Sequence, residues 1–160
     1  MFLFRLKLTL LSVLGGAHAL LEESLVSFEP VDGSVALQGA TIIHDGQDAE
    51  TVKIAVRALA SDWEDITGTE ASTCQWMSNS TRSCEAETAI VVGTVGSDLI
   101  KELGDKVAVS DIEGKWETFQ TSVISDPLHG VGKALVIAGS DKRGAAFGLY
   151  TLAEQSGQSP

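Results

Sequence analysis

Several residue types are scarce in this 160-residue sequence, and each shortage excludes a class of protein. Only two cysteines and three histidines are present, and His18, His44 and His129 have no metal-like spacing to Cys74 or Cys84. A structural zinc site needs four such ligands. We therefore expect no metal site.

Basic residues are also few. Eleven lysines and arginines stand against 22 aspartates and glutamates, which gives a formal net charge of -11 at pH 7. So acidic a surface repels phosphate backbones and anionic lipid headgroups. We expect neither nucleic acid nor a membrane surface as a partner.

Long hydrophobic runs are missing, and the one apolar stretch of note lies at the N-terminus. Arg5 and Lys7 precede the run 8–14, and Ala17-His18-Ala19 has the small-x-small pattern of a cleavage site. This layout is typical of a secretory signal peptide. The alternative, a membrane anchor, needs about 20 apolar residues, far more than this run has.

We therefore expect residues 1–19 to be removed and residues 20–160 to form one secreted, extracellular domain. In an oxidising compartment, Cys74 and Cys84 are expected to form a disulfide, because a redox Cys-x-x-Cys pattern is absent. Asn79-Ser80-Thr81, between the two cysteines, is an acceptor sequence for N-glycosylation at Asn79.

Short apolar runs and turn residues predict an α/β (α+β) fold, a two-layer sandwich in which helices pack on a mixed sheet of four to five strands. The expected extended segments are Val26–Glu29, Val35–Leu37, Thr41–Asp45, Thr88–Gly93, Trp116–Ile124 and Ala134–Ala138. Helices are expected from Asp48, as N-cap, to Gly68, over Ser97–Leu103, and over Arg143–Ser156. The segment Thr69–Glu87 is expected to be a loop.

The aromatic residues and the C-terminal helix give further expectations. Trp63 and Trp116 fall in predicted elements, which leaves Trp76 in the loop as the exposed tryptophan. On the C-terminal helix, one apolar stripe is expected to face the core, namely Ala146, Leu149, Tyr150 and Ala153. Phe147 and Leu152 are expected to point away from it, and such an exposed apolar patch favours self-association.

The turn between Gly139 and Gly144 follows a strand and opens a helix, as a phosphate-binding loop does. A Walker loop has lysine directly after its second glycine, whereas Ala145 follows Gly144 here. Gly93-Thr94-Val95-Gly96 likewise does not fit the dinucleotide-binding pattern. We expect no nucleotide and no cofactor.

Within this turn, Asp141, Lys142 and Arg143 are candidate functional residues. Asp141 is suited to cap the helix, whereas cations at a helix N-terminus oppose the macrodipole and gain nothing locally. Lys142 and Arg143 therefore have one of two roles: a structural or interdomain contact, or a contact with a substrate such as a uronate.

Catalytic residues cannot be nominated from the sequence. The mature histidines, His44 and His129, lie in no recognisable nucleophile motif. A glycosidase needs two carboxylates about the scissile bond, but the many acidic residues are scattered and no spacing pairs them.

The amino-acid sequences of two segments point more specifically to a protein family. The segments 88–103 (TAIVVGTVGSDLIKEL) and 112–160, which includes GKWE at Gly114–Glu117 and ALVIAGSDKRG at Ala134–Gly144, resemble the N-terminal domain of fungal glycoside hydrolase family 115, the xylan α-1,2-glucuronidases. The resemblance implies a hydrolase that removes (4-O-methyl)glucuronic acid from glucuronoxylan with inversion, by carboxylates of a barrel domain that follows this segment in the family.

On this resemblance the chain is expected to be a non-catalytic N-terminal domain that ends before the barrel and is inactive alone. Its polysaccharide partner, glucuronoxylan or its oligosaccharides, would be bound through the missing catalytic domain. The alternative is a secreted accessory module that binds polysaccharide without hydrolysing it.

Overall fold

The computed structural model describes residues 25–27, 32–69, 71–79 and 83–157. The predicted signal peptide lies outside these residues. The described part of the chain forms the following elements: β1 (Thr41–Asp45), α1 (Glu50–Thr67), β2 (Thr73–Trp76), β3 (Ala86–Thr94), α2 (Asp98–Leu103), the 3-10 turn η1 (Gly104–Lys106), β4 (Phe119–Ser125), β5 (Val131–Gly139) and α3 (Lys142–Gln155).

The five strands form one sheet in the order β2-β1-β3-β5-β4. All neighbours are parallel except β4, which runs antiparallel to β5. The central strands β3 and β5 carry the continuous buried runs 89–92 and 134–138, as strands covered on both faces do. The mixed α/β class and the sheet of four to five strands are confirmed.

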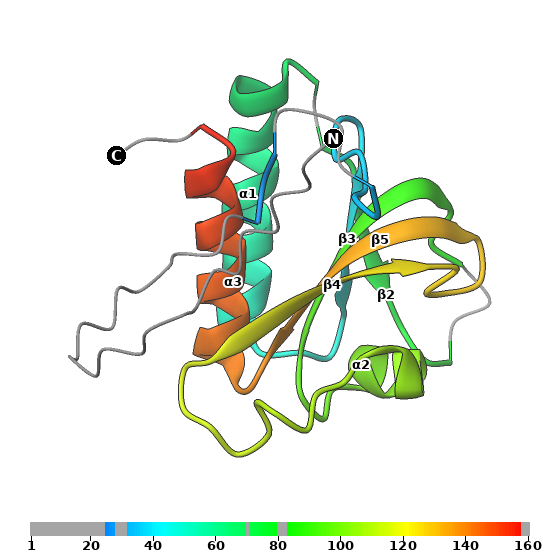
Figure 1. Cartoon of the computed structure of the whole chain (residues 1–160), viewed down its shortest axis with the longest axis vertical. Coiled ribbons are helices and arrows are strands. Elements are labelled where there is room, and N and C mark those ends of the chain that lie inside the picture. Colours follow the sequence, from blue (N-terminus) through cyan, green and yellow to red (C-terminus); the bar gives the residue numbers. More distant parts are fainter. Residues whose placement is uncertain (1–24, 28–31, 70, 80–82, 158–160) are drawn as a thin grey trace, which may run out of the picture.

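Helices cover both faces of the sheet (Figure 1). α1 and α3 pack side by side on one face, and α2 lies on the other. Because successive residues of a strand point to opposite faces, neighbours on β3 enter different cores. Ile90 and Val92 pack toward α1 and α3, whereas Ala89 and Val91 pack toward α2.

The predicted first helix is present, but its predicted cap is wrong. Ala49 occupies the cap position of α1, and no capping side chain accepts a hydrogen bond from the amides of the first turn. The Asp48 carboxylate instead accepts hydrogen bonds from Thr94 at the end of the neighbouring strand β3, so a long-range partner replaces the amides of the first helical turn. The predicted end is confirmed, because Gly68 adopts φ 71° and donates its amide hydrogen to the Glu64 carbonyl.

Two expectations about extended segments need correction. Val35–Leu37 forms no strand; its apolar side chains rest partly buried against the core. The expected loop Thr69–Glu87 contains β2, which pairs in parallel with β1. This strand has only four residues, and its alternation of exposed and half-buried positions gives too weak a pattern to detect. Of Val26–Glu29, the last two residues lie outside the described ranges.

The predicted disulfide is confirmed. Cys74 of β2 and Cys84, which precedes β3, are bonded, with their Cα atoms 5.9 Å apart. The bridge fastens the edge strand to the segment that leads into the centre of the sheet. Asn79 is exposed in the turn after β2.

The C-terminal helix is confirmed, but two of its side chains face the other way. Leu152 is fully buried, and Tyr150 is 50% exposed. α3 contacts both α1 and the sheet, so its buried arc is wider than a single stripe and takes in Leu152. Phe147 is 41% exposed, as expected.

Candidate functional site

The carboxyl edge of the parallel strands is the place to look for a site, because open α/β sheets bind ligands there, where the strand order reverses. Here the reversal lies between β1 and β3. β1 ends at Asp45 and β3 at Thr94. Two aspartates from the β1–α1 connection lie at this point, Asp45 and Asp48.

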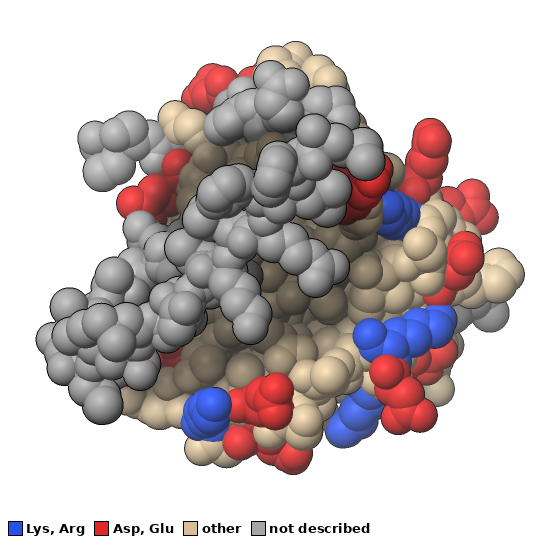
Figure 2. All heavy atoms as spheres, in the orientation of Figure 1, with Lys and Arg blue, Asp and Glu red and all other residues tan. Residues whose placement is uncertain are grey.

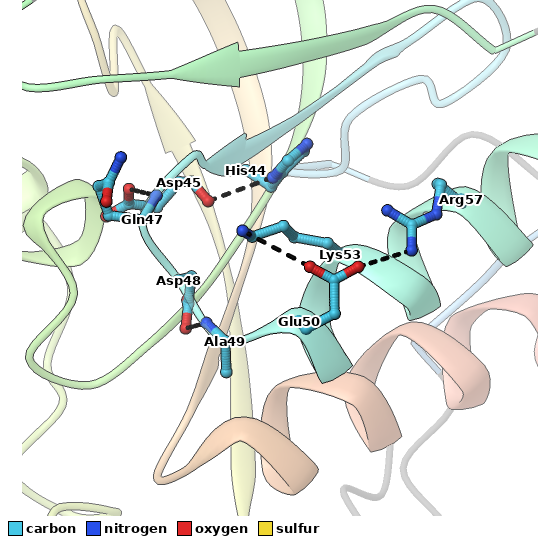
Figure 3. Close-up of polar contacts among 8 residues, drawn as sticks. All are labelled: His44, Asp45, Gln47, Asp48, Ala49, Glu50, Lys53 and Arg57. Atoms are coloured by element: carbon cyan, nitrogen blue, oxygen red, sulfur yellow. Dashed lines mark hydrogen bonds and ion pairs between the residues drawn. The ribbon is translucent and has the colours of Figure 1, made fainter.

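Asp45, the last residue of β1, is 1% exposed and lies beside Gln47 (Figure 3). Its Oδ1 accepts a hydrogen bond from the Gln47 amide at 2.7 Å. Its Oδ2 accepts one from the amide of Leu99, in the first turn of α2, at 3.2 Å. The carboxylate thus takes up a helix amide that would otherwise be free to bind an anion.

Asp48 is 8% exposed and closes the remaining gap. Its Oδ1 accepts hydrogen bonds from the Ala49 amide at 2.7 Å and from the Thr94 hydroxyl at 3.0 Å. Its Oδ2 accepts one from the Thr94 amide at 2.8 Å. The gap between the ends of β1 and β3 is therefore filled by Asp45 and Asp48, whose carboxylates accept hydrogen bonds from backbone amides and from one hydroxyl.

The side chains at the start of α1 form surface ion pairs, and His44 on β1 is half-buried beside them. Glu50 pairs with Arg57 at 2.8 Å and with Lys53 at 3.7 Å (Figure 3). The hydrogen bond from Arg57 lowers the pKa of Glu50. Burial lowers the pKa of the half-buried His44, whose Nδ1 lies 3.3 Å from the Asp45 carbonyl oxygen. The lowered pKa favours the neutral imidazole.

The turn between β5 and α3 holds the three residues nominated from the sequence. Asp141 caps α3, as expected: its Oδ1 accepts hydrogen bonds from the amides of Arg143 at 2.9 Å and Gly144 at 2.8 Å. Its Oδ2 accepts one from the Glu117 amide at 3.0 Å. The amide bonds, with that of Gly144 foremost, lower the pKa of Asp141. Lys142 is exposed.

Arg143 faces the segment that precedes β4. Its Nη1 lies 2.7 Å from Glu117 Oε1. This contact is an ion pair without hydrogen-bond geometry, since Oε1 is buried and has no hydrogen-bonding partner. The guanidinium carbon also lies 5.8 Å from the centroid of the Trp116 ring. Loop 116–118 and the start of α3 therefore form one unit, and they lie side by side in Figure 1.

Two of the three tryptophans lie elsewhere than the sequence predicts. Trp116 precedes β4 instead of lying in it and is 76% exposed, whereas Trp76 at the end of β2 is half-buried. Trp63 is buried, as expected. The one clue that the sequence offered was Gly114, two residues before Trp116, which marks a turn instead of a strand.

The glycines of the suspected phosphate loop serve packing instead. A Cβ on Gly139 would lie 2.1 Å from the Ala145 nitrogen, and one on Gly144 would lie 2.2 Å from the Thr118 carbonyl oxygen. Only glycine permits this close approach of β5, α3 and the loop before β4.

A hollow of about 520 Å³ lies at the opposite edge of the sheet. Lys106 Nζ donates hydrogen bonds there to the carbonyl oxygens of Asp126 at 2.7 Å and Pro127 at 3.2 Å. His129 also lines the hollow. The ammonium group of Lys106 is thus engaged by backbone carbonyls.

Two wider properties complete the description. Among the described residues, no group of three or more histidine, cysteine, aspartate or glutamate side chains could hold a metal ion, and no helix is long and apolar enough to cross a membrane. On the face in Figure 2, acidic side chains are spread around the rim, and the basic ones have acidic neighbours.

Comparison with known proteins gives one informative result. No protein-family model matches the sequence, and no curated protein matches it significantly. Among solved structures, the chain is similar to a family GH115 4-O-methyl-α-glucuronidase, BtGH115A, described as specific for decorated arabinogalactans. The match has 29% identity and a TM-score of 0.58, and it covers 76% of this chain and 14% of that one. The similarity supports a function related to glycoside hydrolysis.

Proposed function

We propose that this chain is the N-terminal, non-catalytic α/β domain of a secreted glycoside hydrolase related to the xylan α-1,2-glucuronidases. The observation that carries the proposal is the similarity to the GH115 glucuronidase over 76% of the chain. The chain corresponds to only 14% of that enzyme, so the activity of the whole enzyme is a proposal here, as is its action on glucuronoxylan side chains.

The engagement of the carboxylates supports a non-catalytic role. Glycoside hydrolysis uses an acid and a second carboxylate that are free to meet the sugar. Asp45 and Asp48 are buried and bonded to amides, Asp141 caps a helix, and Glu117 pairs with Arg143. We therefore assign no catalytic role to these four carboxylates.

Secretion is part of the proposal. It rests on the leader pattern of residues 1–19, on the disulfide between Cys74 and Cys84, and on the exposed glycosylation acceptor Asn79. Lys142 and Arg143, beside the helix cap Asp141, are proposed to contact the domain that follows or its substrate. Both are exposed at the carboxyl edge of the sheet, where an α/β domain meets its ligands or partners.

A chimera tests the proposal. The segment of the GH115 glucuronidase that matches this chain is replaced by residues 20–160, and release of 4-O-methylglucuronic acid is measured. We expect a folded chimera with activity within about tenfold of the parent, because the domain supports the catalytic part and leaves the transition state untouched.

The matched control chimera carries Ile137→Asp, which places a charge in the buried core and should abolish folding and activity. An inactive chimera whose inserted domain is folded would contradict the proposal. The purified chain alone should release no glucuronic acid from glucuronoxylan; release that persists in preparations free of contaminating hydrolase would show a catalytic pair in this domain.

The second candidate, an accessory module that binds polysaccharide without hydrolysing it, is favoured by one observation. Trp116 is 76% exposed, and an exposed indole ring offers a platform for a sugar. Retention of the isolated chain on insoluble xylan, together with an inactive chimera, would favour this candidate.

A further inference from the structure

Trp116 is the most exposed large apolar side chain in the described part of the chain, yet its backbone is firmly held. The Thr118 hydroxyl donates to the Trp116 carbonyl oxygen at 3.0 Å. The Thr118 amide donates to Ser140 Oγ at 3.0 Å, and the Ser140 amide donates back to the Thr118 carbonyl oxygen at 2.7 Å. These hydrogen bonds fix the position from which the Trp116 ring projects, whereas a side chain at the tip of a loop without such bonds has no fixed position.

The residue after it is strained. Glu117 has φ 51°, a left-handed conformation that non-glycine residues rarely adopt. Such residues persist where the surroundings fix them, and they cluster at ligand sites. Here the Glu117 amide is held by the Asp141 carboxylate and its side chain by Arg143. The fixed backbone of Glu117 therefore restricts the direction in which the neighbouring Trp116 side chain projects.

Three cations, Arg143, Lys142 and Lys115, lie in the segments around the ring, together with the carboxylates of Glu117 and Asp141, in a chain whose net charge is -11. The Arg143 side chain is 56% exposed, and its guanidinium carbon lies 5.8 Å from the centroid of the Trp116 ring. Lys142, which precedes Arg143, and Lys115, which precedes Trp116, are both exposed. A guanidinium has five N–H donors, and the contact with one Glu117 oxygen leaves most of them for another carboxylate. The helix amides contribute nothing, since Asp141 already accepts from those of Arg143 and Gly144.

We propose that Trp116, Arg143 and Lys142 bind an acidic oligosaccharide, with a sugar ring stacked on the indole and its carboxylate paired with the guanidinium. The apolar face of a pyranose ring matches the large rigid area of an indole, and arginine pairs with carboxylates in a planar, bidentate manner. The choice of sugar, a xylo-oligosaccharide that carries 4-O-methylglucuronic acid, rests on the proposed function. Residues and geometry alone select the acidic class.

The test titrates the isotope-labelled chain with two probes of four sugar units each, an aldotetraouronic acid and neutral xylotetraose. The indole N–H signal of Trp116, assigned by its loss in Trp116→Ala, should shift with both sugars. The acidic sugar should bind about tenfold more tightly, the expected gain from a charged pair. Arg143→Gln should abolish this preference, and Trp116→Ala should weaken both interactions about tenfold or more, since stacking area is lost.

Tyr150→Ala is the matched control. It removes a half-exposed aromatic ring from α3 and should leave the affinity for both sugars unchanged. If Trp116→Ala fails to fold, Trp116→Phe keeps a ring and should show a smaller loss. Three results would overturn the proposal: unchanged binding by Trp116→Ala, equal affinity for the two sugars, or no shift of the Trp116 signal with either. If the Trp116 signal does not shift with either sugar, Trp116, Arg143 and Lys142 would instead be assigned to a contact with another domain. An active chimera combined with no sugar binding would remove this inference while leaving the proposed function intact.

Discussion

Two turns at the carboxyl edge of the sheet use aspartate in opposite ways. At the β1–α1 turn, Asp45 and Asp48 point inward and are almost completely buried. At the β5–α3 turn, Asp141 also accepts amide hydrogen bonds, but it stands beside exposed cations and an exposed tryptophan. The β1–α1 turn is therefore filled by its own aspartate side chains, whereas the β5–α3 turn exposes side chains that can contact a ligand or another domain.

The largest effect should come from the closed turn. Asp48→Ala leaves three donors unpaired at a buried position, namely the amides of Ala49 and Thr94 and the Thr94 hydroxyl. We expect a loss of about 3 kcal/mol in the free energy of unfolding, measured by urea denaturation. Asp48→Asn keeps one acceptor oxygen and should lose less. A stability equal to that of the unmodified chain would show that water replaces the carboxylate and that the turn is open.

The second prediction asks whether the outward turn is also tightly packed. In Gly144→Ala the new methyl group would lie 2.2 Å from the Thr118 carbonyl oxygen. The loop before β4 must shift, at a cost of about 2 kcal/mol by comparison with other overpacked sites. Thermal unfolding measures the loss, with Thr151→Ala on the same helix as control. An unchanged melting temperature would mean that the loop is loosely held.

The third prediction concerns Asp141 and pH. Asp141→Ala removes the cap of α3 and should cost about 1 kcal/mol at neutral pH. Because amide hydrogen bonds lower the pKa of Asp141 below its ordinary value of 3.8, its stabilising contribution is present above that value. It is lost as the pH falls through the lowered pKa. The difference between the two proteins in urea denaturation should therefore shrink on acidification from pH 6 to pH 2; a constant difference would contradict the assignment.

The predictions for Asp48 and Asp141 depend on hydrogen bonds that could be predicted from the sequence only in part. The cap at Asp141 was predictable, because an aspartate between a buried strand and an apolar helix has a local partner. Asp48 has the same local signature, yet its decisive partner, Thr94, is 46 residues away. Local pattern cannot distinguish these cases, because the competing hydrogen bond exists only once β1 and β3 are neighbours.

The same reasoning explains the success with the sheet and the failure with Trp116. The runs at 89–92 and 134–138 are apolar on both faces, so their burial is encoded within each segment. The exposure of Trp116 depends on the left-handed Glu117 and its contacts with Asp141 and Arg143, and no residue pattern near Trp116 announces them. The charged residues of the candidate site, Asp141, Lys142 and Arg143, could thus be predicted from the sequence, whereas the exposed ring of Trp116 could not.

The smallest effect on stability is expected on the outer surface of α3. Phe147 and Tyr150 are 41% and 50% exposed, so replacing both by serine should change the free energy of unfolding by less than about 0.5 kcal/mol. Self-association, measured by sedimentation, should decrease, because an exposed apolar patch is removed. Leu152→Gln is the contrasting variant, because Leu152 is fully buried and its replacement should unfold the protein.

The bridge between Cys74 and Cys84 has a practical consequence for anyone who produces the protein. β2 is a four-residue edge strand that pairs only with β1, and the bond ties it to the entry of β3. In the reducing cytosol of a bacterial host this tie cannot persist. Material made there would carry a loosened strand and an unpaired edge on β1, a template for fibre-like stacking, so export to an oxidising compartment is the route to homogeneous protein.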